Sequence, residues 1–478
     1  MQYLRLMQIK KICFIAVIFV TSSSLCQTNN TSPYSRYAFG ELFGTDNAYY
    51  FGAGGLNIPT VNYNQVNIGN PASYSYLLRH KPIFNVGLKA KLLELNTTSD
   101  KQISNQIGLS NFTMGLPIGK KGGAAFGIRP YSTVGYSMVD PATDAHAGDY
   151  TYNYSGHGGI NRVFVGASRK LFDRPFIAKT DTSKLRHESS LSIGANAYYL
   201  FGSYSNTRGV DFSDFTYLDT REETTTQISD FMFDGGVYFH YRFKNKKRFL
   251  NKAAIRKDST ISAKFRYLTR AIDFGLIGTL ATDMNAKRDN FVYTYRSTSL
   301  AEFLEDTISY SINSDGQLSL PMSFGAGVTF TYDRFRFGVQ LKMQDWSSYS
   351  EEFDNVVTED LLGPSLDGAF GLEYQKSSDV TNQANSTLSL GIYKIGLRYK
   401  QSPLQINNTV LTEIGMSFGA SLPMRFSGSG SMINFGVELG ERGTTDNNLI
   451  RERFITVRLG LSIMPGRFDN WFWKRKYN

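Results

Sequence analysis

The residues best able to do chemistry in this sequence are five histidines: His80, His146, His157, His187 and His240. Their spacing does not match the short intervals that separate metal ligands in known sites. A hydrolase would need a serine paired with a histidine that a third polar group orients, and no serine motif accompanies His146 or His157. The run Gly52–Gly55 is not a phosphate-binding loop, because no GKS-type continuation follows it. We therefore expect no enzymatic activity, no metal site and no cofactor.

The overall composition favours a β-rich protein. The 478 residues include 44 glycines, and 14% of them are aromatic while 19% are charged. This mixture suits many strands joined by tight turns. The formal net charge of +10 comes without a basic helix or an aromatic stacking motif, so we expect no nucleic-acid partner.

Residues 1–27 have the pattern of a secretory signal peptide. Basic residues precede an apolar run, Ile12–Val20, which is too short to cross ~30 Å of hydrocarbon as a helix. Leu25 stands where a lipoprotein signal carries a small residue, which argues against lipidation at Cys26. Because Cys13 and Cys26 are the two cysteines of the chain, we expect the exported protein to lack disulfides and thiol chemistry.

Two segments near the C-terminus show the alternation that decides the fold class. In Ile433–Leu439 and Ile455–Ile463 every second residue is apolar, while the residues between are polar or glycine. A two-sheet sandwich alternates in the same way, but long strands, many glycines and an export signal together favour a transmembrane barrel. We predict an all-β fold, a closed antiparallel barrel of fourteen strands, because such bacterial barrels have an even strand number. The strands are expected at 83–98, 102–118, 122–139, 152–171, 188–206, 224–243, 258–282, 318–332, 334–348, 368–378, 389–400, 408–422, 431–441 and 451–464.

The connections between these strands fall into two alternating classes. One class is mostly short and basic, as in Gly119–Gly122, Asp333–Arg334 and the longer Lys244–Arg248. The other is mostly longer and acidic, with examples at 140–151, 207–223, 283–317 and 349–367. Short turns face the periplasm and long loops face outward in such barrels. We therefore expect a protein of the outer membrane of a Gram-negative bacterium, in contact with lipid and lipopolysaccharide, with both termini in the periplasm.

The stretch Ser32–Tyr76 shows neither a helical period nor sustained alternation, although it is rich in glycine, asparagine and aromatic residues. Loops of this length are usually functional or disordered, and disordered chains are poor in aromatic residues. We expect this stretch to fold inside the barrel as a plug. The predicted organisation is a signal peptide at 1–27, a plug at 28–81, a barrel at 82–465 and a basic, aromatic tail at 466–478.

Two further features narrow the fold to a family. Pro130 lies inside the third expected strand, where proline cannot donate to the ladder, and it predicts a break in the wall or a bulge near the rim. Asn70-Pro71-Ala72 is expected to form a turn at the end of the plug. A glycine-rich N-terminal segment ending in Asn-Pro-Ala, followed by fourteen strands with an interruption in the third, resembles the FadL-type outer-membrane transporters of long-chain fatty acids and other hydrophobic compounds. The resemblance implies that Asn70, Pro71 and Ala72 belong to a hatch that plugs the barrel, and that Pro130 belongs to a kink that opens a lateral exit.

The resemblance also implies passive uptake of hydrophobic or amphipathic small molecules. An apolar groove among the outer loops would collect the compound, lined by Phe212, Phe215, Tyr217, Phe291, Tyr293, Phe303 and Phe353. Cations of the lumen could meet its carboxylate head group: Arg129, Arg162, Arg336, Arg398 and Arg458. Alternatively, these arginines pair with Glu438 and with the plug acids Glu41 and Asp46, since structural ion pairs are the commoner use of such charges. A different function also stays open, that of a non-transporting barrel that serves, with other outer-membrane proteins, as a subunit or scaffold of an assembly or secretion complex.

Overall fold

The computed structural model describes residues 32–44, 47–174, 188–243, 246–249, 265–297, 301–354, 356–358, 362–375, 390–424 and 430–465. The expected signal peptide and tail, Asp46 and His187 lie outside the described residues. Within these ranges no helix is long and apolar enough to cross a membrane.

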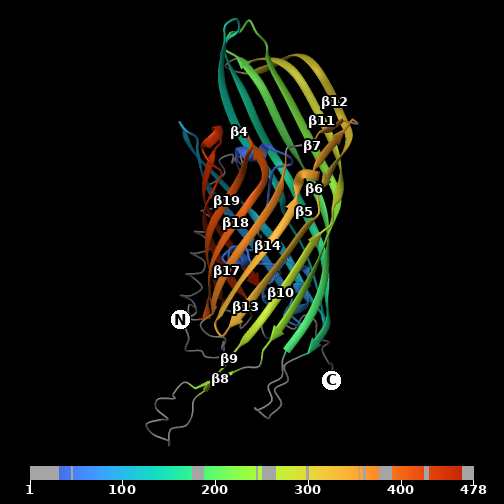
Figure 1. Ribbon diagram of the computed structural model, residues 1–478. Coiled ribbons are helices and arrows are strands. Elements are labelled where there is room, and N and C mark those ends of the chain that lie inside the picture. Colours follow the sequence, from blue (N-terminus) through green and yellow to red (C-terminus); the bar gives the residue numbers. More distant parts are fainter. Residues whose placement is uncertain are drawn as a thin grey trace, which may run out of the picture.

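Fourteen antiparallel wall strands close into a barrel (Figure 1), as the sequence predicts. Most are continuous: β2 (Ile83–Asn96), β3 (Lys101–Ile118), β4 (Gly122–Asp144), β5 (Gly148–Arg174), β6 (Glu188–Phe212), β7 (Asp219–Arg242), β18 (Ile392–Ile406), β19 (Thr409–Pro423), β20 (Met432–Arg442) and β21 (Arg451–Ile463). The others are interrupted: β10 (Arg270–Thr279) continues as β11 (Thr282–Ser297), β12 (Glu302–Leu320) as β13 (Ser323–Tyr332), β14 (Phe335–Asp345) as β15 (Ser350–Phe353), and β16 (Val356–Thr358) as β17 (Pro364–Gln375). Pairing of β21 with β2 closes the barrel.

Short elements occupy the plug and the ends of the barrel. The plug contains η1 (Pro33–Arg36), β1 (Glu41–Leu42), α2 (Ala48–Phe51) and η2 (Pro71–Tyr76). Outside the plug lie η3 (Trp346–Ser348), η6 (Asp446–Asn448) and a two-stranded sheet of β8 (Lys246–Phe249) and β9 (Phe265–Leu268). Asn47 and Asn70 cap α2 and η2 with side-chain oxygens that accept from backbone N–H groups, which satisfies donors that a helix start leaves open.

Alternation along the strands sorts side chains between the outside and the lumen. On β20 and β21 the apolar residues Phe435, Leu439 and Leu459 are exposed, whereas Asn434 and Glu438 are buried inside the barrel. Apolar side chains outward and polar side chains inward are the arrangement that a lipid bilayer imposes on a barrel. The fold is therefore that of an outer-membrane barrel.

The plug, blue in Figure 1, lies inside the barrel. Its side chains pack against the wall, and Tyr49, Leu56 and Tyr74 are buried. Wall glycines let the two backbones approach closely. A Cβ atom at Gly396 of β18 would lie 1.9 Å from the backbone nitrogen of Gly54, so no larger residue fits there without displacing the plug.

Several strands are longer than the sequence predicts, and one is misplaced. The strand expected at 258–282 is the pair β10–β11, which runs over 270–297, and the next strand already begins at Glu302. The acidic segments 283–317 and 140–151, expected as loops, lie mostly within strands. These predictions are wrong because these segments continue beyond the lipid-facing belt, where no single buried face imposes alternation on the sequence.

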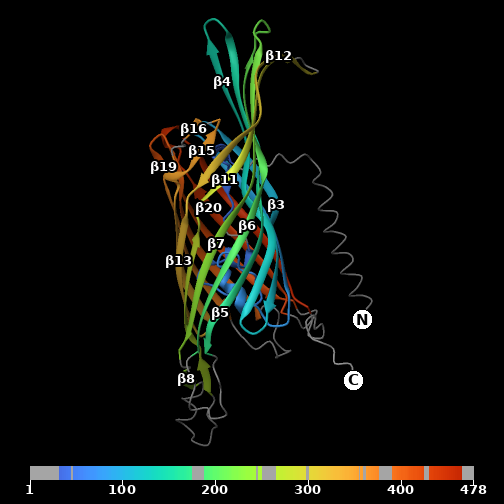
Figure 2. The same cartoon turned by 90° about the vertical axis from the view of Figure 1, so that its right-hand side faces the viewer.

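One side of the barrel wall stands well above the other (Figures 1 and 2). Six strands continue there as a sheet, which we call the outer sheet and define as 136–144 of β4, 148–157 of β5, 204–212 of β6, 219–226 of β7, 287–297 of β11 and 302–315 of β12. The strands of the outer sheet pair in that order, so β4 and β12 form its two lateral edges.

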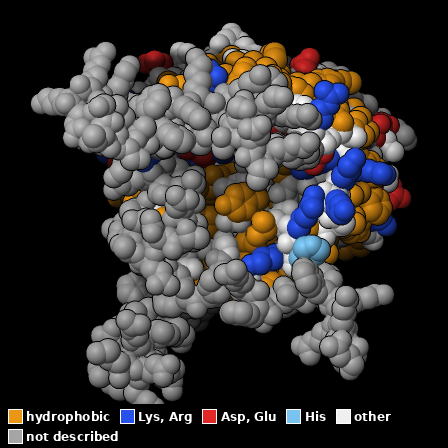
Figure 3. All heavy atoms as spheres, turned by 90° about the horizontal axis from the view of Figure 1, so that it is seen from below, with side chains coloured by type: hydrophobic (Ala, Val, Ile, Leu, Met, Phe, Trp, Pro, Cys, Tyr) orange, Lys and Arg blue, Asp and Glu red, His pale blue; other side chains and the backbone are white. Residues whose placement is uncertain are grey.

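The two classes of connection lie at opposite ends of the barrel. The basic turns Gly119–Lys121 and Asp333–Arg334 lie at the lower end, and the tip of the β4–β5 hairpin, residues 145–147, lies at the upper end (Figure 2). Seen from below, Lys and Arg side chains gather on one side of the described surface (Figure 3).

Candidate functional site

The barrel wall is interrupted between β3 and β4. The two strands pair from Ile118↔Gly122 only as far as Phe112↔Ile128, although β3 extends to Lys101 and β4 extends to Asp144. Pro130 lies just beyond the last pair, beside a register shift between β4 and β5, and it has no backbone N–H to donate. We call this gap in the wall the seam.

Plug residues occupy the free edge of β4 at the seam. We call the segment Ser32–Phe43 the latch. At one end of the latch, Glu41 and Leu42 pair with Thr133 and Ser132 of β4, and Phe43 N donates to Tyr131 O at 2.9 Å. At the other end, Ser32 N donates to Gly135 O at 3.1 Å, and Gly135 N donates to Ser35 Oγ at 3.0 Å. The latch thus takes the place beside β4 that β3 leaves empty.

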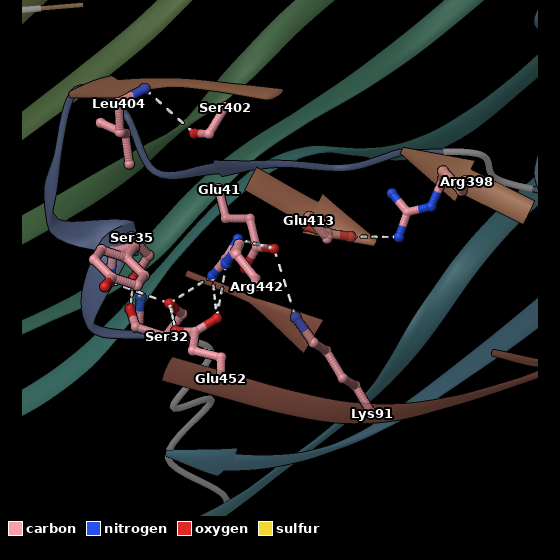
Figure 4. Close-up of polar contacts among 12 residues, drawn as sticks. Ser32, Ser35, Glu41, Lys91, Arg398, Ser402, Leu404, Glu413, Arg442 and Glu452 are labelled. Carbon is pink, nitrogen blue, oxygen red and sulfur yellow. Dashed lines mark hydrogen bonds and ion pairs between the residues drawn. The ribbon is translucent and has the colours of Figure 1, made fainter. Parts of the chain in front are cut away.

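A buried ion-pair network ties the latch to strands on the other side of the seam (Figure 4). Arg442 of β20 lies 3.0 Å from Glu41 of the latch and 2.6 Å from Glu452 of β21. The hydroxyl of Ser32 accepts from Arg442 at 2.7 Å and donates to Glu452. Lys91 of β2 places a second cation 3.5 Å from Glu41. The latch is therefore hydrogen-bonded to one side of the seam and ion-paired to the other.

The charge of Glu41 depends on these cations. Burial alone would raise the pKa of this carboxyl, but attraction to Arg442 and Lys91 holds the pKa well below its usual range. Glu41 is consequently ionised at neutral pH. Removing one partner of such a buried pair leaves an uncompensated charge, so the closed latch requires that these charges stay paired.

The Asn70-Pro71-Ala72 turn fastens a second part of the plug to the wall. Asn70 is fully buried, and its Nδ2 atom donates to Val237 O of β7 at 3.2 Å, while its Oδ1 atom accepts from Ala72 N at 3.1 Å. Pro71 begins η2, where its fixed φ and missing N–H suit the first helical position. The carbonyl of Ala72 accepts from the hydroxyl of Ser192 on β6 at 3.0 Å. The structure thus places this turn against β6 and β7.

A cavity of about 260 Å³ lies in the lumen between the plug and the wall. Its aromatic lining includes Phe39, Tyr131, Tyr198 and Trp346, and its basic lining comprises Arg129, Arg162, Lys342, Lys400 and Arg442. Apolar walls with a few charged groups are the usual composition of small-molecule sites. Glu41 and Leu42 of the latch also line the cavity, so it reaches the seam.

Two of the arginines predicted to lie in the lumen, Arg129 and Arg162, are neighbours at this cavity. They are directly opposite each other on β4 and β5. The guanidinium of Arg162 also lies 5.0 Å from the ring centre of Tyr131 and 4.9 Å from that of Tyr198. With Asp234, which also lines the cavity, the two arginines leave a net positive charge at this wall that would attract an anion, and the two tyrosine rings supply apolar surface beside it.

The remaining predicted cations lie elsewhere in the lumen, each with a partner. Arg398 is ion-paired with Glu413 and Glu438, Arg336 lies 3.2 Å from Glu373, and Arg458 lies 4.4 Å from the ring centre of Phe51 in the plug. Pairing with Glu438, one of the two readings of the sequence, therefore holds for Arg398. The plug acid Glu41 pairs with Arg442 and Lys91, which the sequence does not single out because their partner is so distant in the chain. Asp46 lies outside the described residues.

The aromatic residues predicted to line an outer groove do not surround this cavity. They lie on or beside the outer sheet: Phe212 against Tyr217, Phe291 against Tyr293, Phe353 buried against Arg288, and Phe215 and Phe303 exposed. The reason is that the expected loops are largely strands, which distribute these residues along the sheet as separate pairs and single side chains.

One histidine, His240, belongs to a polar cluster that the sequence does not reveal. His240 Nδ1 lies 2.5 Å from Asp273 Oδ1, and Asp273 Oδ2 accepts from the Thr329 hydroxyl at 2.9 Å. Because Thr329 contacts the aspartate and not the histidine, this is not a nucleophile–base pair. His146 lies at the tip of the β4–β5 hairpin, and His157 is exposed on β5. In the part of the chain that the structure describes, no group of three or more His, Cys, Asp or Glu residues is arranged to hold a metal ion.

Comparison with known proteins adds a family to this geometry. The model of the BamG family matches residues 7–478. The chain belongs to the BamG family. No curated protein matches the sequence.

Solved structures share the fold of this BamG-family chain. The toluene transporter TbuX of Ralstonia pickettii aligns with a TM-score of 0.51 at 12% identity, over 88% of this chain and 98% of its own. A FadL homologue of Pseudomonas aeruginosa aligns with a TM-score of 0.51 at 12% identity, over 89% of this chain and 99% of its own. At such low identity the likeness establishes the fold. The predicted resemblance to FadL-type transporters is therefore confirmed for the architecture.

Proposed function

We propose that this BamG-family barrel mediates passive uptake of an amphipathic small molecule with an anionic head group, which it releases sideways through the seam. The observation that carries the proposal is the continuity between the cavity and the latch. The cavity has aromatic walls, is bordered by Arg129 and Arg162, and is closed toward the seam by Glu41 and Leu42. A compound held there leaves when the latch separates from β4.

The physical need for such a route comes from the two layers that an amphiphile must cross. Polar headgroups outside the membrane slow the passage of its apolar part, whereas the hydrocarbon core accepts that part readily. A barrel with a plugged lumen and a lateral gap delivers the compound directly into hydrocarbon. The structurally similar TbuX is described as a toluene transporter, which supports the proposal that this barrel takes up an apolar or amphipathic compound.

The orientation of the barrel follows from its two ends. Short basic turns lie at the lower end and the outer sheet at the upper end. Because short turns face the periplasm in outer-membrane barrels, we infer that the upper end faces outward and that both termini lie in the periplasm. Outer-membrane lipid and lipopolysaccharide then surround the wall at the level of the seam.

A disulfide between the latch and β4 tests the uptake proposal. Leu42 and Ser132 are direct partners on β1 and β4, so Leu42→Cys with Ser132→Cys should lock the latch. We expect the oxidised variant to lose most of the uptake of a radiolabelled long-chain carboxylate in cells that lack the native gene. Reduction should restore this uptake, because it frees the latch again.

A second engineered disulfide provides the matched control. Val437 and Val457 are direct partners on β20 and β21, within the continuous wall, so Val437→Cys with Val457→Cys should leave uptake unchanged in both redox states. If cells without the gene take up the compound as fast as cells with it, the uptake proposal is wrong.

A second function is favoured by the outer sheet. It stands beyond the rim as a sheet with two lateral edges. A barrel does not need such a sheet to cross the membrane, and uptake through the seam does not involve it. We propose as the alternative that the barrel is a subunit or scaffold of an outer-membrane assembly or secretion complex. Purification in mild detergent tests this: a partner protein should co-purify, and it should disappear from the membrane of cells that lack the gene while uptake stays the same.

A further inference from the structure

Among the residues that the structure describes, β12 forms a free and highly exposed edge of the outer sheet. Residues 302–315 pair with β11 on one side, while β15 pairs with β12 only from Gly316 to Ser319 on the other. Every residue from Glu302 to Tyr310 is exposed. The backbone N–H and C=O groups along this edge therefore face solvent, as in a template for another strand.

Apolar side chains also gather along this edge. Their exposed fractions exceed half: Phe303 57%, Leu304 59%, Ile308 59%, Tyr310 61% and Ile312 51%. Charged neighbours such as Glu305, Asp306 and Arg296 place this part of the strand outside hydrocarbon. An exposed apolar strip outside the membrane, bordered by charge, is typical of a protein interaction site.

The charge of the outer sheet selects the partner. Every basic residue of the outer sheet already has an acidic partner: Arg208 with Glu222, Arg221 with Glu302, Lys287 with Asp315, Arg288 with Glu351, and Arg296 with Glu305. Further acids remain in excess. Asp306 lies on β12 itself and Asp289 on β11 beside it, whereas the others lie on strands farther from this edge: Asp140, Asp144, Asp149, Asp211, Asp219 and Glu223. Complementary charge requires a basic partner. A second copy of this chain would bring the same acidic edge and would be repelled.

Bulges in β12 add selectivity. Its pairing with β11 shifts register at three places, between Arg288 and Asn290, between Val292 and Tyr293, and between Thr294 and Tyr295. Bulges twist an edge and discourage indiscriminate strand addition. A partner must therefore supply matching side chains as well as a backbone.

We propose that the free edge of β12, residues Glu302–Ser314, accepts an extended basic segment of another protein as an added strand. This inference rests on the second proposed function, that of a complex subunit, and is independent of uptake. Backbone bonds to β12 give affinity, the apolar strip packs against alternate side chains of the segment, and the acids select its lysines or arginines.

Peptide binding to the purified full chain in detergent tests the proposal. The probe is a fluorescent peptide of alternating valine and lysine, about as long as the edge. We expect it to bind in a saturable manner, and the same peptide with glutamate in place of lysine not to bind. Methylation of alternate backbone nitrogens should abolish binding, because it removes strand donors without changing charge.

Two double variants separate this edge from general attraction. Glu305→Gln with Asp306→Asn should weaken binding of the valine–lysine peptide about fivefold, because it removes two negative charges at the edge and leaves Arg296 without its acidic partner. Asp140→Asn with Asp149→Asn removes the same charge from β4 and β5 and should leave binding unchanged.

Three outcomes would overturn the proposal. Equal weakening by both double variants would show that the peptide is attracted to the acidic surface in general and not to this edge. Unchanged binding of the methylated peptide would exclude strand addition. Sedimentation that shows a dimer of the wild-type chain, lost in the Glu305 and Asp306 variant, would assign the edge to a second copy. The methylated peptide keeps the test valid on the wild-type protein even where a variant folds poorly. Failure here would leave the co-purification test and the uptake test unaffected.

Discussion

Arg442 Nη1 on β20 lies 3.0 Å from Glu41 Oε1 on the latch, across 401 residues of sequence. The side chain of Arg442 is 9% exposed and that of Glu41 is 23% exposed, so the pair is largely shielded from solvent. Strands β20 and β21 carry another ion pair, Arg453–Glu441, at an equal distance of 3.0 Å, but its side chains are 50% and 46% exposed. The barrel thus contains a buried pair and an exposed pair of similar geometry side by side.

Arg442→Gln should destabilise the protein strongly. It leaves the fully buried Glu452 without its cation and Glu41 with Lys91 alone, and loss of one partner of a buried ion pair costs about 3–5 kcal/mol. Arg453→Gln, the matched control, should cost less than about 1 kcal/mol. Both changes in stability can be measured in detergent gels, as the temperature above which the barrel no longer migrates as its compact folded form. Equal shifts for the two variants would show that the latch network carries no special stability.

The latch should weaken in acid. Because the folded pKa of Glu41 lies below the ordinary glutamate value of about 4.3, its stabilisation is fully present above that pH and is lost as the pH falls below it. We expect the unfolding temperature of the wild type to drop more steeply between about pH 5 and pH 3 than that of Glu41→Gln. Other carboxyls titrate in both proteins, so the difference reports Glu41. Parallel curves would contradict this assignment.

Gly396→Ala should displace the plug. The added methyl group would lie 1.9 Å from the backbone nitrogen of Gly54, and overpacking of this kind costs about 1–3 kcal/mol. Gly108→Ala on β3 is the control, because no atom lies within 4 Å of the added group there. Protease digestion of the folded barrel should release plug fragments from the Gly396 variant only. Release from both variants, or from neither, would mean that close backbone contact does not hold the plug.

Asn70→Ala should loosen the other end of the plug. It removes donors to Ile58 O at 2.8 Å and Val237 O at 3.2 Å and the acceptor for Ala72 N, with an expected loss of about 1–3 kcal/mol. Asn70→Asp keeps the acceptor but not the donors. If the donors matter, both variants should unfold at lower temperature than the wild type; an aspartate variant as stable as wild type would assign the effect to the helix cap alone.

Lys342→Gln should reduce uptake of an anionic amphiphile more than uptake of its neutral methyl ester. Lys342 lines the cavity, and removing its charge weakens only the ligand that carries an opposite charge. Lys287→Gln, which lies on the outer sheet and pairs with Asp315, is the control and should change neither rate. An equal reduction for the acid and the ester would contradict the proposal that the cavity recognises an anionic head group.

The sequence predicts the barrel, its strand number and the plug because each leaves a local pattern. Phe435 and Leu459 alternate with polar residues since one face of their strands meets lipid and the other meets the lumen. That reasoning fails at β12, where residues from Glu302 to Tyr310 are exposed on both faces and alternation has no cause. It fails again at the latch, because pairing of Glu41 with Arg442 depends on register and closure, which no local pattern encodes.

The glycines that admit the plug are distributed over most of the chain. A Cβ atom at Gly123 of β4 would lie 1.9 Å from Tyr74 O, and one at Gly419 of β19 would lie 2.6 Å from the Cα atom of Gly52. The plug precedes the wall strands in the chain, yet the wall that surrounds it includes the last strands of the chain. A wall this close to the plug leaves no clearance for threading it into a finished cylinder. We therefore expect the wall to gather around the plug before pairing of β21 with β2 closes the barrel.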